Sequence, residues 1–457
     1  MNFYFDAAKT LDKLDAKEGS IKSTIALLPE KNRKRTSALV IETLKYKSAL
    51  TDTIQKSQLL KQERKIKSLN LAVVLVHDLL LAGGIQAGDG PIKQAILRHK
   101  TRLNAEFTKL KIKRKATNNS DLAQEADPRA AKIPRYVRVN TKFWRTGEAI
   151  DYFTKKGFSI GDPLQSSTNI ARDQHVPDLL LFAPQTSLLD DPAYTAGKVI
   201  LQDKASCFPA FVLSPPAHDE TVAIDATAAP GNKTSHLSAV MEGKGKLFAF
   251  ERDRKRFGTL KMMLRKAACE NVTPVNVDFL TVDPSDSEYA SVTHILLDPS
   301  CSGTGIVNRL DHLLYTENET EDIGQDRLNK LAAFQLKMIK HAMRFPNVQK
   351  IVYSTCSVYA TENEQVVSSA LESEEAAAAS FVLAPREEVL PAWQRRGYQE
   401  EMRKGDAGSV IRCLAGEDAT NGFFVSCFIR KPVVNKRATP PQGLRDDQCK
   451  KKKLKYS

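Results

Sequence analysis

The stretches THILLDPSCSGTG (residues 293–305) and IVYSTCSVYATENEQVV (residues 351–367) decide the fold. In each, a run of β-branched and apolar residues ends in small residues and a cysteine, Cys301 or Cys356. Such runs predict buried strands of a parallel sheet. Because the carboxyl ends of parallel strands share one edge, and open α/β sheets bind ligands there, we expect both thiols in one ligand site.

The sequence from about residue 197 onward predicts the rest of this sheet, because strand-like runs alternate there with helical stretches. The expected strands are 221–225, 246–251, 274–278, 294–298 and 351–355, and the expected helices are 233–242, 253–268, 326–345 and 361–372. Residues 423–431 predict an antiparallel edge strand. Most of the parallel strands end in a carboxylate, which we place at the ligand edge: Asp225, Glu251, Asp278 and Asp298.

At 457 residues the chain exceeds what one hydrophobic core usually serves, so we expect several units. Helical spacing of apolar residues predicts an all-helical domain over 1–115. A polar segment, 116–132, has the composition of a structureless linker. Strand-like and helical stretches then indicate a small α+β module over 133–196. The α/β domain follows over 197–432, with a basic, disordered tail over 433–457.

The net charge of +14 is concentrated at the two ends of the chain. Residues 1–116 hold 24 lysines and arginines against 11 acidic residues, and residues 431–457 hold 9 against 2. Clusters such as KIKRK (111–115) and KKKK (450–453) attract phosphate, which favours contact with nucleic acid. The alternative is solvated helix faces and a solvated tail. The terminal cluster also fits a nuclear import signal.

Other patterns exclude whole classes of protein. The first ten residues lack the basic and apolar regions of a secretory signal, and the seven cysteines have no regular spacing, so we expect reduced thiols in an intracellular protein. The apolar stretch 71–84 is too short for a membrane span and predicts a buried helix. The other cysteines lack zinc spacing, so we expect no metal: Cys207, Cys269, Cys413, Cys427 and Cys449.

The strand at 221–225 leads into the loop DATAAPGNKT (225–234), which indicates a cofactor site. Its small side chains let the backbone approach a ligand, and the following helix offers N–H donors to a carboxylate. The loop matches neither the dinucleotide fingerprint nor a P-loop. Glu251 is placed to accept hydrogen bonds from a ribose, and Asp278 from an adenine amino group. The alternative is a tight turn beside two surface carboxylates.

These motifs, together with LQDKASCFPA (201–210), PRYVRVNT (134–141) and NGFFVS (421–426), resemble the NOL/NOP/Sun-domain RNA cytosine-5 methyltransferases over about residues 134–430. EGSIKS (18–23) and DPSCSGTG are most similar to the subgroup that modifies large-subunit ribosomal RNA. The resemblance implies S-adenosylmethionine as methyl donor. It implies these cofactor-binding residues: Thr227, Ala228, Ala229, Pro230, Gly231, Asn232, Lys233, Glu251, Arg256, Asp278 and Asp298. Thr227 stands where the family often has cysteine, and Glu251 where it often has aspartate.

Methylation at C5 of cytosine requires a thiolate to add at C6 first, because C5 alone is a poor nucleophile. Spacing leaves open which cysteine attacks. The resemblance implies Cys356 as nucleophile and Cys301 as the group that assists release. DNA cytosine-5 methyltransferases use the earlier cysteine and a Glu-Asn-Val motif, and the tripeptide at 270–272 follows the wrong strand for that role.

Two further residues have alternative roles. Asp298 either reads the N3 and amino edge of a flipped cytosine or caps its loop, and we favour the first. Lys204 either touches phosphate or substrate near the active site or is a surface lysine.

The main hypothesis is therefore an enzyme that forms 5-methylcytosine in large-subunit ribosomal RNA. The small module would recognise RNA, and the protein would act as a monomer in the nucleus and nucleolus, without a membrane or metal. The same chemistry on transfer or messenger RNA is a second hypothesis. A catalytically silent RNA-binding assembly factor is a third.

Overall fold

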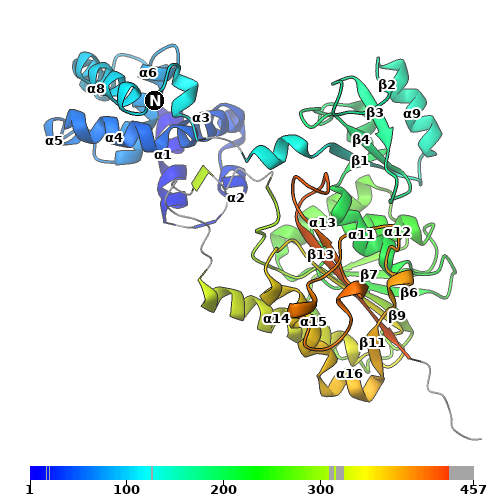
Figure 1. The fold of residues 1–457 in the computed structure, drawn as a ribbon. Coiled ribbons are helices and arrows are strands. Elements are labelled where there is room, and N and C mark those ends of the chain that lie inside the picture. The colour runs from blue at the N-terminus through cyan, green and yellow to red at the C-terminus, as the bar shows by residue number, and fades with distance from the viewer. Residues whose placement is uncertain (17, 20, 125–126, 308–312, 315–323, 432–457) are drawn as a thin grey trace, which may run out of the picture.

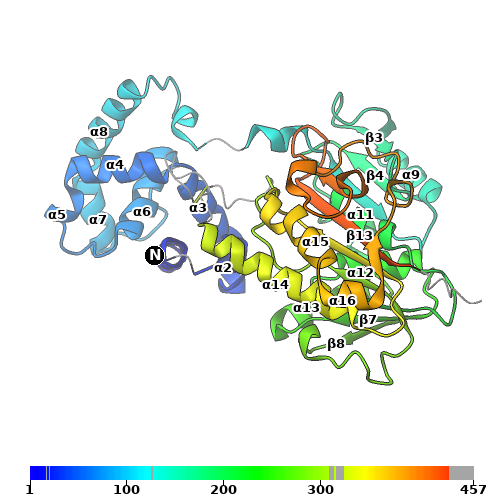
Figure 2. The same cartoon turned by 60° about the horizontal axis from the view of Figure 1, so that its bottom comes forward.

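The computed structural model describes residues 1–431 except 17, 20, 125–126, 308–312 and 315–323. Figures 1 and 2 show the N-terminal helices as a separate body beside a larger α/β body. The expected tail at 433–457, with Cys449 and the KKKK cluster, lies outside the described residues.

The N-terminal body is all helical, as its apolar spacing predicts. Its buried residues come from every part of the region and include Tyr4, Leu50 and Leu103. Leu313, which follows the Cys301 loop along the chain, packs in the same core, so the α/β body also contacts these helices. The helices are α1 (Asn2–Asp15), α2 (Ile21–Ala26), α3 (Arg33–Lys45), α4 (Lys47–Ser57), α5 (Leu59–Gln62), α6 (Leu69–Leu81), α7 (Pro91–Arg98) and α8 (Lys100–Lys113), with the 3₁₀ helix η1 at Glu30–Asn32.

The apolar helix at 69–81 is buried along most of its length, as predicted, and Tyr4 donates a hydrogen bond to Asp78 on it. No helix in the described part of the chain combines the length and the apolar character that crossing a membrane requires.

The segment 116–132 is more ordered than its composition predicts. It contains the 3₁₀ helices η2 (Asn119–Leu122) and η3 (Pro128–Lys132). In η2, Asn118 and Asp121 form a capping box, and Leu122 packs against Phe107 and Leu110 of α8. The polar composition did not predict this structure, because the Asn and Asp side chains that cap a short helix also favour loops.

The α+β module has a five-stranded sheet in the order β2-β3-β4-β1-β5. Its strands are β1 (Arg135–Val139), β2 (Ser159–Ile160), β3 (Asn169–Arg172), β4 (Leu179–Phe182) and β5 (Val199–Leu201), with helices α9 (Thr146–Lys155) and α10 (Pro192–Thr195). The sequence pattern ends the module at residue 196, but β5 pairs with β1 and extends the sheet to Leu201. A strand of three residues gives too short a pattern to recognise.

The α/β body has an eight-stranded sheet whose main path runs β11-β13-β10-β9-β6-β7-β8. The five strands β10 to β8 on this path are parallel. They are β6 (Val222–Asp225), β7 (Lys246–Phe250), β8 (Val272–Val275), β9 (Val292–Leu297) and β10 (Lys350–Thr355). The chain begins at β6, extends outward through β7 and β8, and then returns to β9 and β10. The order therefore reverses between β6 and β9.

The strand β13 (Phe423–Arg430) pairs antiparallel with β10, as expected. It does not form the edge itself, because the short strands β11 (Phe381–Leu383) and β12 (Ile411–Cys413) pair with its outer side. Neither short strand was predicted, since each has only three residues.

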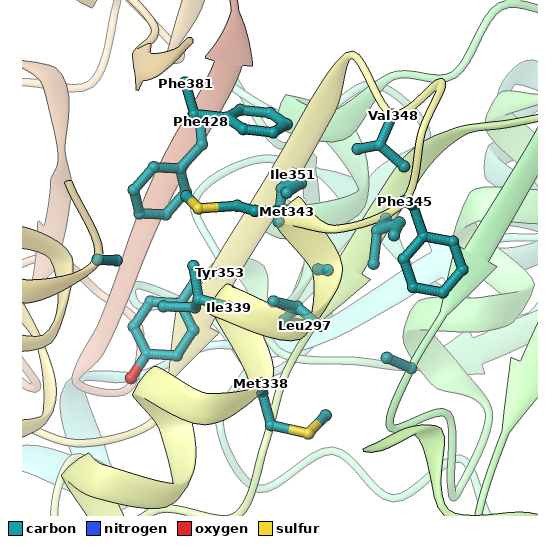
Figure 3. Packing of buried hydrophobic residues seen from close by; sticks show 14 of the residues in the cluster. Leu297, Met338, Ile339, Met343, Phe345, Val348, Ile351, Tyr353, Phe381 and Phe428 are labelled. Atoms are coloured by element: carbon teal, nitrogen blue, oxygen red, sulfur yellow. The ribbon is translucent and has the colours of Figure 1, made fainter. Parts of the chain in front are cut away.

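Helices cover both faces of the large sheet because the side chains of its strands alternate between them. On one face, residues such as Phe248, Leu297 and Tyr353 pack against α14 (Gln325–Met343), α15 (Glu364–Leu371) and α16 (Glu374–Ala379), as Figure 3 shows in part. On the other, residues such as Leu247 and Leu296 pack against α11 (Lys204–Leu213) and α12 (Asn232–Val240). The helix α13 (Arg254–Lys266) covers the end near β7 and β8.

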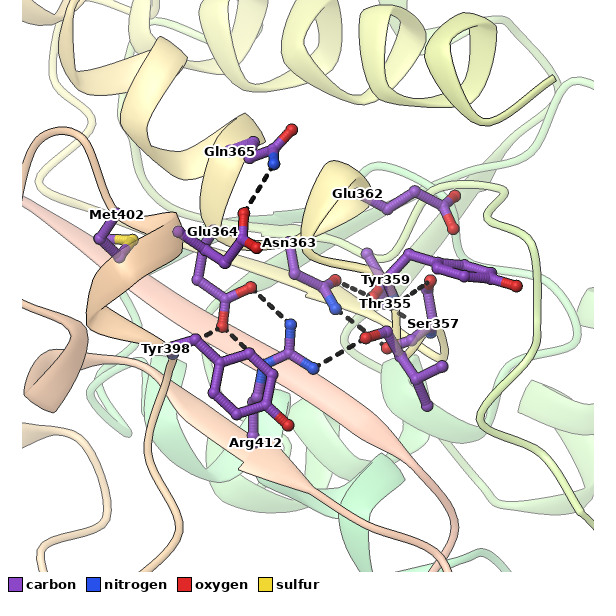
Figure 4. A network of polar contacts seen from close by, with 12 residues as sticks. Thr355, Ser357, Tyr359, Glu362, Asn363, Glu364, Gln365, Tyr398, Met402 and Arg412 are labelled. Atoms are coloured by element: carbon purple, nitrogen blue, oxygen red, sulfur yellow. Dashed lines mark hydrogen bonds and ion pairs between the residues drawn. The ribbon is translucent and has the colours of Figure 1, made fainter. Parts of the chain in front are cut away.

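A buried ion pair joins α15 to β12. Arg412 and Glu364 are 2% and 0% exposed, and two guanidinium nitrogens of Arg412 each lie 2.5 Å from a carboxylate oxygen of Glu364 (Figure 4). Arg412 also donates to the carbonyl of Val358, close after Cys356. Removing one member of such a pair leaves an uncompensated charge in the interior, which is costly.

We predict that Arg412→Met lowers the free energy of unfolding by about 3–5 kcal/mol, because Glu364 stays buried without its partner. The double variant Arg412→Met/Glu364→Leu should regain much of this loss. Urea unfolding measures both, with Arg403→Met, at an exposed arginine, as the control. Equal stability of the single and double variants would contradict the argument.

Candidate active site

The loops that follow β6 and β9 meet at the reversal of strand order. The hydroxyl of Thr227, after β6, accepts the backbone N–H of Asp298, after β9, at 3.0 Å. The ammonium of Lys233 lies 2.7 Å from Oδ2 of Asp298. A reversal of this kind leaves a crevice at the carboxyl edge of the sheet, where open α/β folds bind ligands.

The ion pair between Lys233 and Asp298 is partly shielded from solvent. The two side chains are 15% and 27% exposed, and Ser354 of β10 donates to Oδ1 of Asp298 at 2.8 Å. Burial opposes the charge of Lys233, but Asp298 outweighs it and raises the pKa of Lys233. Lys233 also interacts electrostatically with Cys356. The side chain thus places a cation between the cofactor loop and a catalytic candidate.

The carboxylates predicted at the strand ends differ in position. Asp225 ends β6 and accepts the hydroxyl of Thr234 at 2.7 Å, and burial raises its pKa to about 6. Its place in the interior fits a support for the loop. Glu251 directly follows β7, is buried, and lies 3.4 Å from Nη1 of Arg256.

Asp278 does not end a strand, in contrast to the prediction. The strand β8 ends at Val275, and Asp278 caps a 3₁₀ helix, Phe279–Thr281, by accepting the N–H of Leu280. It also lies 3.3 Å from Arg252. Directly after the strand, the side-chain amide of Asn276 donates to the carbonyl of Glu251.

The remaining residues of the cofactor loop, Ala228 to Asn232, connect β6 to α12. Ala228 donates its N–H to the carbonyl of Phe250 at the end of β7, and Arg256 donates to the carbonyl of Ala229 at 2.7 Å. Pro230 follows Ala229 through a cis peptide bond. Gly231 has a φ of 116°, which side chains rarely adopt, so a glycine is required at this turn.

The two cysteines lie side by side, as the sequence predicts for neighbouring parallel strands. The sulfur of Cys301 is 3.1 Å from that of Cys356. The hydrogen bond to Cys356, followed by burial, raises the pKa of Cys301 well above its usual range. These contacts hold the proton on Cys301 more tightly than on an ordinary cysteine.

Backbone hydrogen bonds between two glycines and Cys356 fix the distance between the thiols. Gly305 donates to the carbonyl of Cys356 at 2.9 Å, and Gly422, in the NGFFVS motif, donates to the carbonyl of Gly305 at 2.7 Å. A Cβ atom on Gly305 would lie 2.2 Å from the carbonyl oxygen of Gly422 and 2.9 Å from that of Cys356. Only glycine therefore permits this approach.

Lys204 is not a surface lysine, and it does not lie among the cofactor residues. It is 5% exposed, and its ammonium lies 2.7 Å from Asp173 and 2.9 Å from Nδ1 of His175. It therefore ties α11 to the α+β module. Whether it also meets substrate stays a prediction.

The tripeptide at 270–272 has a structural explanation. Asn271 accepts the hydroxyl of Ser238 at 2.6 Å and donates to the carbonyl of Lys244 at 2.8 Å. It joins the start of β8 to the end of α12, away from the cysteines.

Two residues of the site did not stand out in the sequence. Glu362 accepts the N–H of Ser302, next to Cys301. Arg138, in β1 of the module, donates to the carbonyl of Asn232 in the cofactor loop. Both lie in motifs that carry the family resemblance, but a motif gives no distance, and both contacts join residues far apart in the chain.

The fold and the site together define a Rossmann-like methyltransferase with two cysteines at the substrate edge. Three family models match the chain. The model of the 16S rRNA methyltransferase RsmB/F matches residues 210–429. Those of the N-terminal and ferredoxin-like domains of the NOL1/NOP2/Sun domain family member 5 match residues 34–123 and 133–202.

Similar proteins of known function cover nearly the whole chain. The 25S rRNA (cytosine-C(5))-methyltransferase rcm1 of Schizosaccharomyces pombe is 44% identical over 93% of this chain and 91% of its own. The 28S rRNA (cytosine-C(5))-methyltransferase of Mus musculus is 40% identical over 95% and 92%. A solved methyltransferase homologue from Pyrococcus horikoshii shares the fold, with a TM-score of 0.52 and 20% identity over 82% and 99%.

The chain belongs to the NOL1/NOP2/Sun domain family, in the group of family member 5. The family and the α/β fold inferred from the motifs are thereby confirmed. S-adenosylmethionine is the methyl donor of this family.

The residues at the carboxyl edge fit that cofactor chemically. Its sulfonium is cationic and its ribose and adenine offer hydrogen-bond donors, and three carboxylates stand at this edge, on Glu251, Asp278 and Asp298. Glu251 uses one oxygen to accept the N–H of Asp253, which leaves acceptor sites on the other. The N-terminus of α12 offers donors to the methionine carboxylate. The assignment of single residues to the cofactor stays a prediction.

We predict that Gly305→Ala separates the two thiols, because the added methyl group collides with backbone atoms on both sides. Mild oxidation should link Cys301 to Cys356 in the wild-type protein within minutes and should be slowed at least about tenfold in the variant. Mass spectrometry of the linked peptides measures this. The control is Gly258→Ala, where a Cβ atom meets nothing within 4 Å. Equal rates of disulfide formation in the two variants would contradict the claim that the backbone contact at Gly305 holds the thiols together.

Proposed function

We propose that this protein transfers a methyl group from S-adenosylmethionine to C5 of a cytosine in large-subunit ribosomal RNA. The observation that carries this proposal is the 3.1 Å pair of thiols at the carboxyl ends of β9 and β10, beside the carboxylates of the cofactor edge. The names of the relatives from Schizosaccharomyces pombe and Mus musculus support the choice of RNA.

Cys356 is the proposed nucleophile. Its sulfur adds an electron pair to C6 of the cytosine, and the electrons of the C5–C6 double bond move to C5. The bound cofactor supplies an electrophilic methyl group to C5. Lys233 supports this step because its positive charge stabilises the thiolate before the attack.

Cys301 is the proposed base for release. Once Cys356 is bonded to C6, Cys301 gives its proton to solvent and can then take the proton from C5. The electrons of that C–H bond restore the C5–C6 double bond, and Cys356 leaves as a thiolate. The cycle returns both sulfurs to their starting state and releases one proton.

Asp298 is the proposed reader of the base. Its carboxylate is 27% exposed, and within the described part of the chain its side-chain partners are Ser354 and Lys233, so it can still accept a hydrogen bond from the amino group of a flipped cytosine. Lys233 holds the carboxylate in place through its ion pair.

The other parts of the chain are proposed to position the RNA. The helices of residues 1–115 carry the excess of basic charge, which suits contact with phosphate. The α+β module, whose sheet extends to Leu201, is the proposed RNA-recognition unit, and the α/β body that follows it is the proposed catalytic domain. Leu313 links the Cys301 loop to the helical body and would transmit its position.

The cellular setting follows from the substrate. An enzyme of large-subunit ribosomal RNA would work in the nucleus and nucleolus during ribosome assembly. We propose that it acts there as a monomer and without a metal ion.

The protein should methylate large-subunit ribosomal RNA in vitro, and Cys356→Ser should reduce the rate by at least about a thousandfold, because a serine hydroxyl is a far weaker nucleophile at neutral pH. Binding of S-adenosylmethionine should persist, since the cofactor loop is untouched. Bisulfite sequencing and calorimetry measure the two effects. Methylation of transfer RNA alone, or of no RNA, would overturn the proposed substrate or the proposed activity respectively.

The roles of the two cysteines can be read from one gel. If Cys301 promotes release, Cys301→Ala should trap the protein on RNA as an adduct that survives denaturing electrophoresis. The double variant with Cys356→Ala should show none, because no thiol remains to attack. An adduct with Cys356→Ala in place of Cys301→Ala would reverse the assignment.

A further inference from the structure

The loop of Cys301 is held on both sides by two buried side chains. Oε1 of Glu362 accepts the backbone N–H of Ser302 at 3.0 Å, directly after the cysteine. The amide nitrogen of Gln335, on α14, donates to the carbonyl of Ser300 at 3.1 Å, directly before it. The same nitrogen donates to Oε1 of Glu362 at 2.9 Å.

The form of Glu362 follows from its partners. Both groups that bond its side chain in the described chain are donors, which suits an ionised carboxylate, since that group can only accept. Glu362 is 0% exposed, and none of the ion pairs within 4.0 Å among the described residues includes it. Figure 4 shows its carboxylate apart from the guanidinium of Arg412, which pairs with Glu364.

A buried carboxylate without a neighbouring cation lowers the stability of the folded protein, so its charge needs an explanation. The adjacent thiol supplies one. The charged and titratable groups that interact with Cys301 are Cys356, Glu362, Asp298 and Tyr353, and the first three each favour its protonated form. Cys356, by contrast, interacts with the cation Lys233. Anionic groups thus act on Cys301, whereas the cation Lys233 acts on Cys356.

We propose that Glu362 is a positioning residue that fixes the Cys301 loop and keeps the shared proton on Cys301, so that Cys356 carries the negative charge and attacks. This inference rests on the proposed function. The negative charge of Glu362 also makes Cys301 a stronger base once it has lost its proton, which speeds removal of the C5 proton. The carboxylate of Glu362 thereby makes one of two chemically identical thiols the base and the other the nucleophile.

The test removes the negative charge of Glu362 and keeps the shape of its side chain. In Glu362→Gln, the remaining amide oxygen can still accept from Ser302 and Gln335. The pH dependence of Cys301 alkylation by iodoacetamide is followed by mass spectrometry in a Cys356→Ser background, where Cys301 titrates alone. We expect Glu362→Gln to lower the midpoint by about one pH unit. The exposed Glu374→Gln, on α16, should leave the midpoint unchanged.

A second variant covers the case in which Glu362→Gln does not fold. Glu362→Asp retains the charge, so the Cys301 midpoint should stay above the value of about 8.5 that is usual for a free cysteine. A midpoint at that ordinary value in Glu362→Asp, or an unchanged midpoint in a folded Glu362→Gln, would overturn the proposal.

A readout with RNA separates this inference from the proposed function. With both cysteines present, Glu362→Gln should accumulate the RNA adduct and turn over about three- to tenfold more slowly, because a weaker base removes the C5 proton more slowly. If the wild-type protein methylates no RNA, the proposed function fails, yet the alkylation midpoint still decides the role of Glu362. If Glu362→Gln shifts the alkylation midpoint of Cys301 but releases RNA at the normal rate, Glu362 has no effect on release.

Discussion

The whole site depends on the close approach of two loops that are about fifty residues apart in the chain. Hydrogen bonds that join Cys356, Gly305 and Gly422 draw the loops after β9 and β10 together until the two sulfurs lie 3.1 Å apart. Both loops leave parallel neighbouring strands, so the sheet brings them to one edge, but only glycine allows the final contact. Covalent catalysis with a separate release step needs this proximity, because both thiols must reach one pyrimidine.

The α+β module is also part of the cofactor site. Arg138 of β1 is almost fully buried and donates to the hydroxyl of Ser235 at 2.8 Å and to the carbonyl of Asn232 at 3.3 Å. The amide of Asn232 in turn donates to the carbonyl of Leu201 in β5. The residue before Lys233 is thus held by two strands of the module. A unit that meets RNA can therefore affect the geometry of the cofactor loop.

Much of this architecture could be predicted from the sequence because the decisive signals are local. The stretches that form β9 and β10 were predicted at 294–298 and 351–355 because they are rich in β-branched and apolar residues, and the pairing of Cys301 with Cys356 follows from parallel strands alone. The prediction misplaced Asp278 because β8 ends earlier, at Val275, and the short strands β5, β11 and β12 have too few residues for a pattern. The sequence did not indicate Glu362 and Arg138 as site residues, because their roles arise from contacts that only the folded chain creates.

The covalent bond between Cys356 and the target base is the central claim, and a fluorinated RNA tests it most directly. Fluorine at C5 of cytosine cannot leave as a proton does, so the complex should stop after methyl transfer with the enzyme still bonded to C6. Digestion and mass spectrometry then locate the base on a peptide. The account predicts a methylated fluorocytosine on the peptide that contains Cys356. The same base on the peptide of Cys301, or a methylated RNA without any linked peptide, would contradict it.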